Sequence, residues 1–227
     1  MVDLCETGAA LYSHTDVMCF TETYLRDDND TSYFLSEYDF VAFRRNIQND
    51  KAQKSEHGLM ICVSKWMNAQ ELLFRVEGLE SLVVLVNNLR SRLIVGVVYK
   101  PPATSMNTFL KLFESLLHMM PLNIPTVFVG DFNDNLIDNI DSPLVKMMKC
   151  YGFDQLVNTP TTDSGSLLDH IYFNQQATTA EQQSLVDVCD IYYSDHDATF
   201  LTTNIYLKSY NSNVKCMGDT YCSHVDI

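Results

Sequence analysis

The sequence predicts an α+β fold in which packed sheets form the core and helices cover the outer faces. Roughly nine or ten strand-length apolar segments and two or three helical segments follow one another in runs rather than in strict alternation. The 227 residues, 46% of them hydrophobic, suit one large domain with a sizeable core. No run of about 18 apolar residues occurs, so we expect no membrane-spanning segment.

The first third of the chain is predicted to form one short helix and three strands. In order, these are the helix at 4–14 and the strands at 16–22, 38–45 and 58–64. The first of these strands delivers Glu22 to its carboxyl end. The polar segment 46–57 is expected to be the loop of a hairpin between the other two.

Three further strands are predicted at close spacing, at 71–77, 81–87 and 92–99. Turn residues separate them, which is typical of antiparallel pairing. Pro101 ends the third strand, because proline cannot continue a ladder. Apolar residues at spacings of three and four then predict a helix from Met106 to Met120.

The remaining elements alternate between strands and one helix. Ser142 and Pro143 have the character of a helix N-cap followed by a first helical residue. We expect strands at 126–129, 167–173 and 198–207, a helix from 143 to Gly152, and a mobile polar loop at 174–184. Residues 1–207 thus form the predicted domain, and residues 208–227 an irregular tail.

The charge of the chain is strongly acidic, with 15 basic residues against 29 acidic ones and a net charge of −14. This argues against a strong non-specific grip on nucleic acid, which depends on Lys and Arg at phosphates. No Lys or Arg occurs between Lys149 and Lys208. The basic residues that could meet a polyanion lie earlier in the chain, Arg44 and Arg45 among them. Seven scattered cysteines and the lack of a secretory signal favour a reducing, intracellular location, in the nucleus or cytoplasm.

The segment Thr126–Asp134 reads as a buried strand that ends in a glycine turn. Asp131 and Asn133 follow that glycine, and residues two apart in an extended segment point the same way. A carboxylate and a carboxamide aimed together suit work on a phosphate ester. The alternative is a strand followed by an ordinary Asx turn.

Other strands also end in polar residues, and together they suggest a metal-dependent site. The set is Glu22, Tyr99, Asp131, Asn133, Asp169, Asp195 and His196. Gathered carboxylates repel each other unless a cation lies among them, and Mg²⁺ uses one or two carboxylates plus water and substrate oxygens. His196 offers an imidazole that a carboxylate, for example Asp169, could orient.

A structural role also remains open for each of these residues. Glu22 could cap a helix or pair with Arg26, and Tyr99 could be the last aromatic residue of its strand. Asp169 could be a polar edge residue, and 195–197 could be a loop Asx motif. A structural role for all of them at once is a weaker explanation, because separate segments repeat the arrangement.

Five motifs occur in a fixed order along the chain. They are Thr21–Leu25, Val98–Pro102, Gly130–Asn133, Leu168–Ile171 and Ser194–His196. Together they resemble the endonuclease/exonuclease/phosphatase superfamily, and they are most similar to the apurinic-like endonuclease domain of non-LTR retrotransposons. The resemblance runs from about residue 16 to residue 207 and implies a two-sheet, deoxyribonuclease-like sandwich flanked by helices, with four layers.

The resemblance also implies residue roles and a reaction. Glu22 would hold Mg²⁺, or Mn²⁺ in its place, with Asp195 close to the metal. Asp131 would activate water and Asn133 would orient the phosphate. His196, held by Asp169, and Tyr99 would contact phosphate oxygens. The expected substrate is DNA, nicked to leave a 3′-hydroxyl, with Arg44 and Arg45 as further substrate contacts.

Two departures from the family pattern bear on activity. Family members begin with a strand that carries a metal-holding Asn, and nothing before Asp16 supplies it, so we expect a truncated or mis-started chain. The family often has an arginine before the Leu-Asp-His-Ile motif, but the segment 159–163 has none. The resemblance implies a reverse transcriptase domain in full-length relatives, which we do not expect in this chain, and we expect a monomer. An inactive remnant that binds a partner, or an enzyme for small phosphodiesters, remains an alternative.

Overall fold

The computed structural model describes residues 15–26, 39–46, 48–49, 54–55, 57–87, 92–121, 123–174, 184–191 and 194–203. The predicted helix at 4–14 and the predicted tail at 208–227 lie outside these residues. Within them, no helix is long and apolar enough to cross a membrane.

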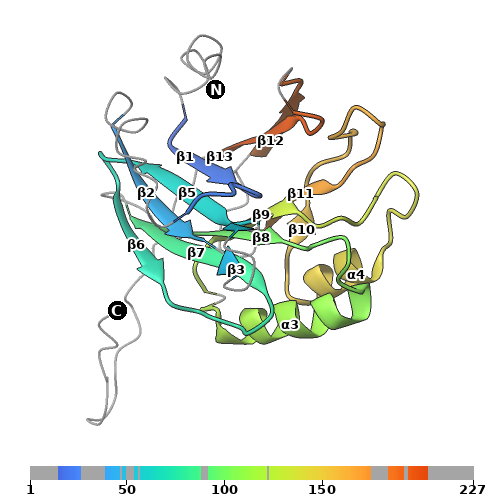
Figure 1. Ribbon diagram of the computed structural model, residues 1–227, viewed down its shortest axis with the longest axis horizontal. Coiled ribbons are helices and arrows are strands. Elements are labelled where there is room, and N and C mark those ends of the chain that lie inside the picture. The colour runs from blue at the N-terminus through green and yellow to red at the C-terminus, as the bar shows by residue number, and fades with distance from the viewer. Residues whose placement is uncertain are drawn as a thin grey trace, which may run out of the picture.

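A six-stranded sheet forms the centre of the molecule (Figure 1). Its strands, in spatial order, are β10 (Asp154–Gln155), β11 (Asp169–Phe173), β9 (Thr126–Asp131), β8 (Arg92–Tyr99), β7 (Glu80–Asn87) and β6 (Asn68–Leu72). Strands β8 and β9 are parallel, and the other neighbours are antiparallel. Because a parallel pair needs a crossover connection, a helix separates these two strands in the chain.

Two helices pack side by side on one face of this sheet (Figure 1). Helix α3 (Met106–Met119) begins after Ser105 and α4 (Pro143–Cys150) after Ser142, and each serine side chain caps the helix by accepting a backbone N–H. Fully buried aromatic and aliphatic side chains of α3 meet the sheet, with Phe113 packed edge-on against Phe128 of β9. This apolar layer joins the two helices to one face of the central sheet.

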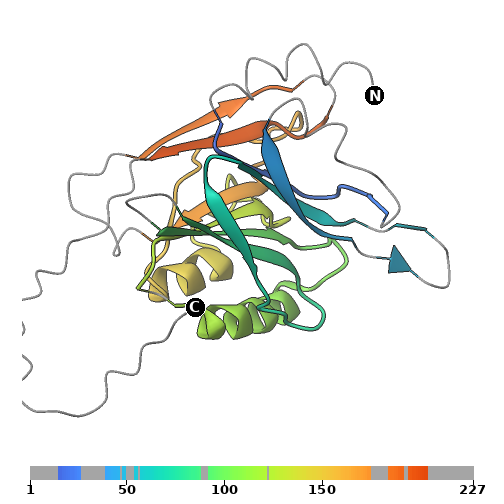
Figure 2. The ribbon, with the colours of Figure 1, turned by 90° about the vertical axis from the view of Figure 1, so that its left-hand side faces the viewer.

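The opposite face of the sheet is covered by shorter ladders (Figure 2). One has the order β1 (Val17–Phe20), β5 (Leu59–Ser64), β2 (Phe40–Arg45), and another pairs β12 (Ser184–Cys189) with β13 (Ala198–Thr203). Apolar residues of β5 pack on β7 and β8, while β12 and β13 pack on β9 and β11. A short ladder of β3 (Gln48–Asn49) and β4 (Lys54–Ser55) lies within the predicted hairpin loop.

The α+β class and the two packed layers of strands are confirmed. Both described helices cover the same face, so the described residues show three of the four expected layers. The strand predicted at 71–77 was wrong in its bounds, because β6 ends at Leu72 and a turn at Gly78 precedes β7. Strand β12 begins inside the predicted loop at 174–184, and the two-residue β10 carries too few side chains to give a pattern.

Candidate active site

The alternation of side chains along three strands brings Tyr99, Asp131 and Asp169 to the same face of the central sheet. Tyr99 belongs to the apolar cluster between the two layers of strands, and Val129 and Ile171 face the same way. Asp131 and Asp169 each lie two residues from one of these and therefore share their face. The two aspartates are also direct partners in the pairing of β9 with β11.

Glycine at position 130 makes the turn into Asp131 possible. Its φ is 144°, and an added Cβ would lie 1.9 Å from the carbonyl oxygen of Val98. Only glycine fits where the backbones of β8 and β9 approach so closely. The predicted glycine turn is therefore required by a close contact as well as by conformation.

Asn133 holds the carboxylate of Asp131 with two hydrogen bonds. Its backbone N–H donates to Oδ1 at 2.9 Å, and its Nδ2 donates to Oδ2 at 3.0 Å. The same Nδ2 donates to the carbonyl of Lys100 at 3.0 Å. Because an amide nitrogen has two hydrogens, both are used inside the protein, and only the carboxamide oxygen is left for a ligand. Donation by Asn133 to a substrate oxygen, as predicted, would require one of these bonds to break.

Asp131 is a buried carboxylate among other charges. Burial raises its pKa to about 6, and the charges of Asp169 and Glu22 act in the same direction. The hydrogen bond from the Asn133 N–H and the charge of His196 act in the opposite direction. A carboxylate whose pKa lies near neutrality can accept a proton in a reaction at pH 7.

Asp169 and His196 form the carboxylate–imidazole pair that the sequence suggested. His196 Nδ1 lies 2.8 Å from Asp169 Oδ2, and the same oxygen accepts the hydroxyl of Thr161 at 2.7 Å. Thr161 is fully buried, and its oxygen also accepts the N–H groups of Leu168 and Asp169. Thr161 therefore fixes the carboxylate that fixes the imidazole.

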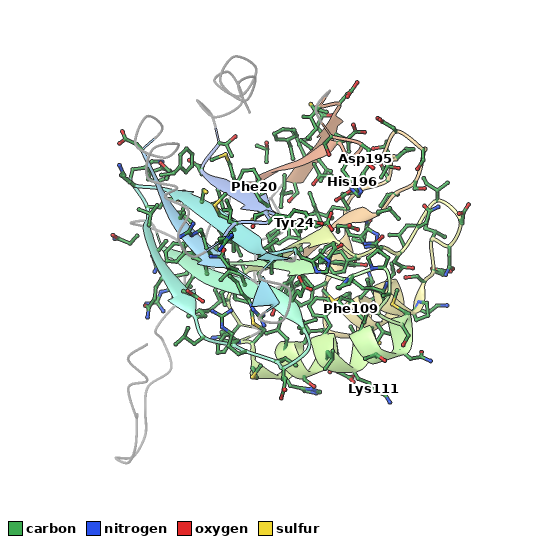
Figure 3. All side chains as sticks on the ribbon, viewed as in Figure 1. Phe20, Tyr24, Phe109, Lys111, Asp195 and His196 are labelled. Carbon is green, nitrogen blue, oxygen red and sulfur yellow. The ribbon has the colours of Figure 1, made fainter. Side chains whose placement is uncertain are left out.

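The turn that carries His196 is tied to the same threonine segment. The N–H of Asp197 donates to the carbonyl of Thr161, and the N–H of Asp163 donates to the carbonyl of Asp195. In Figure 3, Asp195 and His196 lie together on the side of the sheet away from Phe109 of α3. Segment 159–163, which lacks the family arginine, is thus the support of this turn.

His196 is the cationic member of the site. Its hydrogen bond to Asp169 raises its pKa to about 9, against the effect of partial burial, and the charges of Asp131 and Asp195 add to the rise. At pH 7 the imidazole is therefore protonated and donates Nδ1–H to Asp169. Its second N–H can donate to an anionic oxygen of a substrate.

Glu22 lies two residues beyond the carboxyl end of β1, which is shorter than the strand predicted at 16–22, and it is held by two tyrosines. Tyr99 donates its hydroxyl to Glu22 Oε1 at 2.5 Å, and Tyr24 donates to the same oxygen at 3.1 Å. Burial and this bond to Glu22 raise the pKa of Tyr99, so the phenol stays protonated. The hydroxyl predicted to touch a phosphate oxygen is thus engaged with the predicted metal ligand.

Sequence reasoning missed a second carboxylate–imidazole pair beside Tyr99. His57 Nδ1 lies 2.9 Å from Glu80 Oε1, and the ring of His57 is 5.0 Å from that of Tyr99. Glu80 is the cross-strand partner of Tyr99. His57 lies just before β5 and Glu80 is the first residue of β7. Only the position of Glu80 directly before the strand predicted at 81–87 could have indicated the pair.

The two predicted arginine contacts differ in their surroundings. Arg45 Nη1 donates to the backbone carbonyls of Leu79 and Ser81, at 2.8 Å each, and thereby joins β2 to the start of β7. Burial lowers the pKa of Arg45. Arg44 is adjacent on β2, so its side chain projects to the other face of that ladder. DNA contact by either residue stays a prediction.

The residues present suit a hard divalent cation, although the described part of the chain contains no group of three His, Cys, Asp or Glu side chains arranged to hold one. The donors are carboxylate oxygens, and the charges of Glu22 and Asp169 raise the pKa of Asp131, a cost that a cation would relieve. Mg²⁺ needs only one or two carboxylates from the protein. Asp195 is exposed on its turn, and its role as a ligand beside Glu22 stays a prediction.

Comparison with known proteins decides the family. The sequence pattern of the Endonuclease/Exonuclease/phosphatase family matches residues 2–196. The chain belongs to this family. No curated protein matches the chain significantly. The family resemblance drawn from the five motifs is thereby confirmed.

Solved structures of this family share the fold. The endonuclease domain of TRAS1, a telomere-specific non-LTR retrotransposon, matches with a TM-score of 0.66 and 16% identity over 87% of this chain and 88% of that chain. The 3′ phosphatase NExo from Neisseria, bound to a product DNA hairpin, matches with a TM-score of 0.64 and 15% identity. The match covers 88% of this chain and 93% of that chain. An AP endonuclease from Archaeoglobus fulgidus matches with a TM-score of 0.61 and 14% identity. The match covers 88% of this chain and 93% of that chain. At these identities the likeness concerns the fold.

Proposed function

We propose that this chain is a Mg²⁺-dependent DNA endonuclease domain of the retrotransposon type, which nicks one strand and leaves a 3′-hydroxyl. The observation that carries the proposal is the arrangement of Asp131 beside the Asp169–His196 pair. The pKa of Asp131 is about 6 and that of His196 about 9, so at neutral pH one group is a base and the other an acid. Such a division between neighbouring groups is what acid–base chemistry at pH 7 requires.

The chain's own residues supply a proton acceptor and an anion-binding donor. The carboxylate of Asp131 accepts a proton from the attacking water, whose oxygen then bonds to phosphorus as the bond to the leaving 3′-oxygen breaks. The 3′-oxyanion takes up a proton from solvent water and becomes the 3′-hydroxyl. The second N–H of His196 binds a non-bridging phosphate oxygen, and Asp169 keeps the ring in that orientation. Glu22 and Asp195 would hold the metal ion, with Tyr99 fixing Glu22. The bound ion would supply Lewis acidity at the phosphate and the leaving oxygen.

DNA is the favoured substrate because of the family and the retrotransposon-type motifs, but the charge around the site favours a smaller one. Burial and the charges of Asp190 and Asp163 raise the pKa of Asp197, next to His196. An acidic rim of this kind repels a long polyanion more than a small phosphodiester. A small-molecule phosphodiesterase is therefore the second candidate.

Incubation with supercoiled plasmid and Mg²⁺ tests the proposal. The wild-type chain is expected to produce open circles whose nicks a DNA polymerase extends directly, since a 3′-hydroxyl is present. Asp131→Ala and His196→Ala are expected to abolish nicking. Turnover of a small diester without nicking would favour the second candidate. No turnover of either substrate, or nicking that survives both substitutions, would indicate an inactive remnant with a contaminating nuclease at most.

A further inference from the structure

His170 lies directly behind the candidate active site, on the opposite face of β11 from Asp169. It is completely buried, and its partner in the ladder is Gly130. Its ring stacks on that of Phe132, with centroids 5.1 Å apart and an angle of 14° between the planes. The imidazole therefore belongs to the apolar layer that supports the turn from Asp131 to Asn133.

Both ring nitrogens of His170 are committed to bonds inside the protein. Nε2 lies 2.9 Å from the carbonyl oxygen of Asp134, and Nδ1 lies 3.1 Å from the hydroxyl of Tyr172. A carbonyl only accepts, so Nε2 carries the hydrogen. Burial lowers the pKa of His170, so the ring is neutral and Nδ1 accepts the hydrogen of the tyrosine hydroxyl. His170 consequently does not exchange protons with a substrate.

The carbonyl that His170 holds follows a strained residue. Asn133 has a φ of 44°, in the left-handed region that residues other than glycine rarely adopt. Such a conformation persists only where neighbouring groups fix it. The backbone N–H of Asn133 reaches Asp131 Oδ1 from this conformation. The bond from His170 to the Asp134 carbonyl fixes the peptide unit between Asp134 and Asn135, one residue beyond Asn133.

We propose that His170 is a positioning residue: by holding the Asp134 carbonyl it fixes the backbone of Asn133, and through Asn133 it fixes the carboxylate of Asp131. Its effect on a reaction rests on the proposed function. Its effect on the geometry of Asp131 does not, and the two can be measured separately.

Three substitutions separate positioning from general support of the core. His170→Phe keeps the ring and its stacking on Phe132 but removes the donor. His170→Gln can place an amide N–H near the former Nε2 and restore the bond to Asp134. Tyr172→Phe removes a hydroxyl from the same buried cluster and leaves the Asp134 carbonyl bonded. His170→Asn, which is too short to reach Asp134, replaces His170→Phe if that variant does not fold.

The first readout is kinetic and is taken on the folded variants under the conditions of the nicking assay. His170→Phe is expected to lower kcat on the order of tenfold to a hundredfold with little change in KM, since small misplacement of a reacting group has effects of this size. His170→Gln is expected to recover part of kcat, and Tyr172→Phe is expected to stay close to wild type. Equal losses in His170→Phe and Tyr172→Phe would overturn the proposal.

The second readout needs no activity. NMR titration of the Asp131 carboxyl carbon measures its pKa in the metal-free protein. The Asn133 N–H lowers this pKa in the wild-type chain, so His170→Phe is expected to raise it and Tyr172→Phe to leave it unchanged. Identical titration in all variants would contradict the positioning role. A wild-type chain that hydrolyses nothing would refute the proposed function, while this titration would still decide the role of His170.

Discussion

At the scale of single residues, burial and neighbouring charges determine which side chains of the site are protonated at neutral pH. Asp131 is buried among acidic neighbours and binds a proton more tightly than a free aspartate, whereas Asp169 makes His196 retain its proton. Neither effect can be predicted from the sequence, because each depends on contacts between residues far apart in the chain. The positions of Tyr99 and Asp131 at the ends of β8 and β9 could be predicted, since each follows an apolar run.

The stability of the metal-free protein should therefore depend on the ionisation of Asp131. Its pKa is about 6 in the folded chain and near 3.8 when unfolded. The folded chain thus holds the proton more tightly, and the free energy of unfolding falls as pH rises from about 4 to about 6, by at most about 3 kcal/mol. In Asp131→Asn this fall should be absent. Urea unfolding of the wild-type chain and of Asp131→Asn at pH 4 and pH 7 measures this difference. An equal change in the free energy of unfolding in both proteins would show that the pKa of Asp131 is not raised.

Removal of the carboxylate from Asp169 should weaken both the orientation and the charge of His196. Asp169→Asn is expected to lower the pKa of His196 and to lower kcat/KM on the order of a hundredfold or more. Titration of His196 by NMR and steady-state kinetics test this. Asp141→Asn, an exposed carboxylate on the loop before α4, is the control and should change neither quantity. An unchanged His196 pKa in Asp169→Asn would show that another group sets it.

At the scale of elements, the site depends on the ends of β8, β9 and β11 meeting at one edge. The apolar run and Pro101 predicted the end of β8 at Tyr99, and the structure confirms it. Strand β9 continues two residues past the predicted 126–129, and β11 begins at Asp169 rather than at residue 167. The contacts that lock the ends together were not predictable. Thr161 joins β11 to the His196 turn, and Arg45 joins β2 to β7, through pairings that leave no local pattern.

The close approach of β8 to β9 predicts a strict requirement for glycine. Gly130→Ala would place a methyl group against the Val98 carbonyl at a φ that alanine avoids, and it should lower the free energy of unfolding by about 3 kcal/mol or more. Gly165→Ala is the matched control. Its φ is also positive, at 81°, but no atom lies within 4 Å of the added carbon. It should cost about 1 kcal/mol. Chemical denaturation measures the free energy of unfolding of both variants. Similar losses in Gly130→Ala and Gly165→Ala would contradict the steric argument.

At the scale of the whole molecule, a strongly acidic chain carries the site proposed to bind an anionic substrate. The net charge of −14 opposes DNA, and a bound divalent cation would reduce this opposition at the site itself. The fold and the family could be read from the motifs because these lie at strand ends, where the sequence pattern is strongest. The choice between DNA and a small diester depends on the electrostatic field of the assembled surface.

Binding of Mg²⁺ should stabilise the folded chain. With a dissociation constant of about 1 mM, 10 mM Mg²⁺ would add about 1.4 kcal/mol and raise Tm by about 3–5 °C. Thermal unfolding monitored by circular dichroism measures the shift, with equal ionic strength set by NaCl as the control. Glu22→Gln should abolish most of it. An equal rise in wild type and Glu22→Gln would place the bound ion away from Glu22.

The most direct measurement is the single-turnover rate of cleavage of an end-labelled DNA duplex at saturating protein, as a function of Mg²⁺. We expect a rate that rises with Mg²⁺, disappears on chelation, and falls at least about a hundredfold in Asp131→Asn, because a general base is lost. Cleavage that persists in the chelator, or that proceeds equally in wild type and Asp131→Asn, would contradict a metal-dependent hydrolysis centred on Asp131.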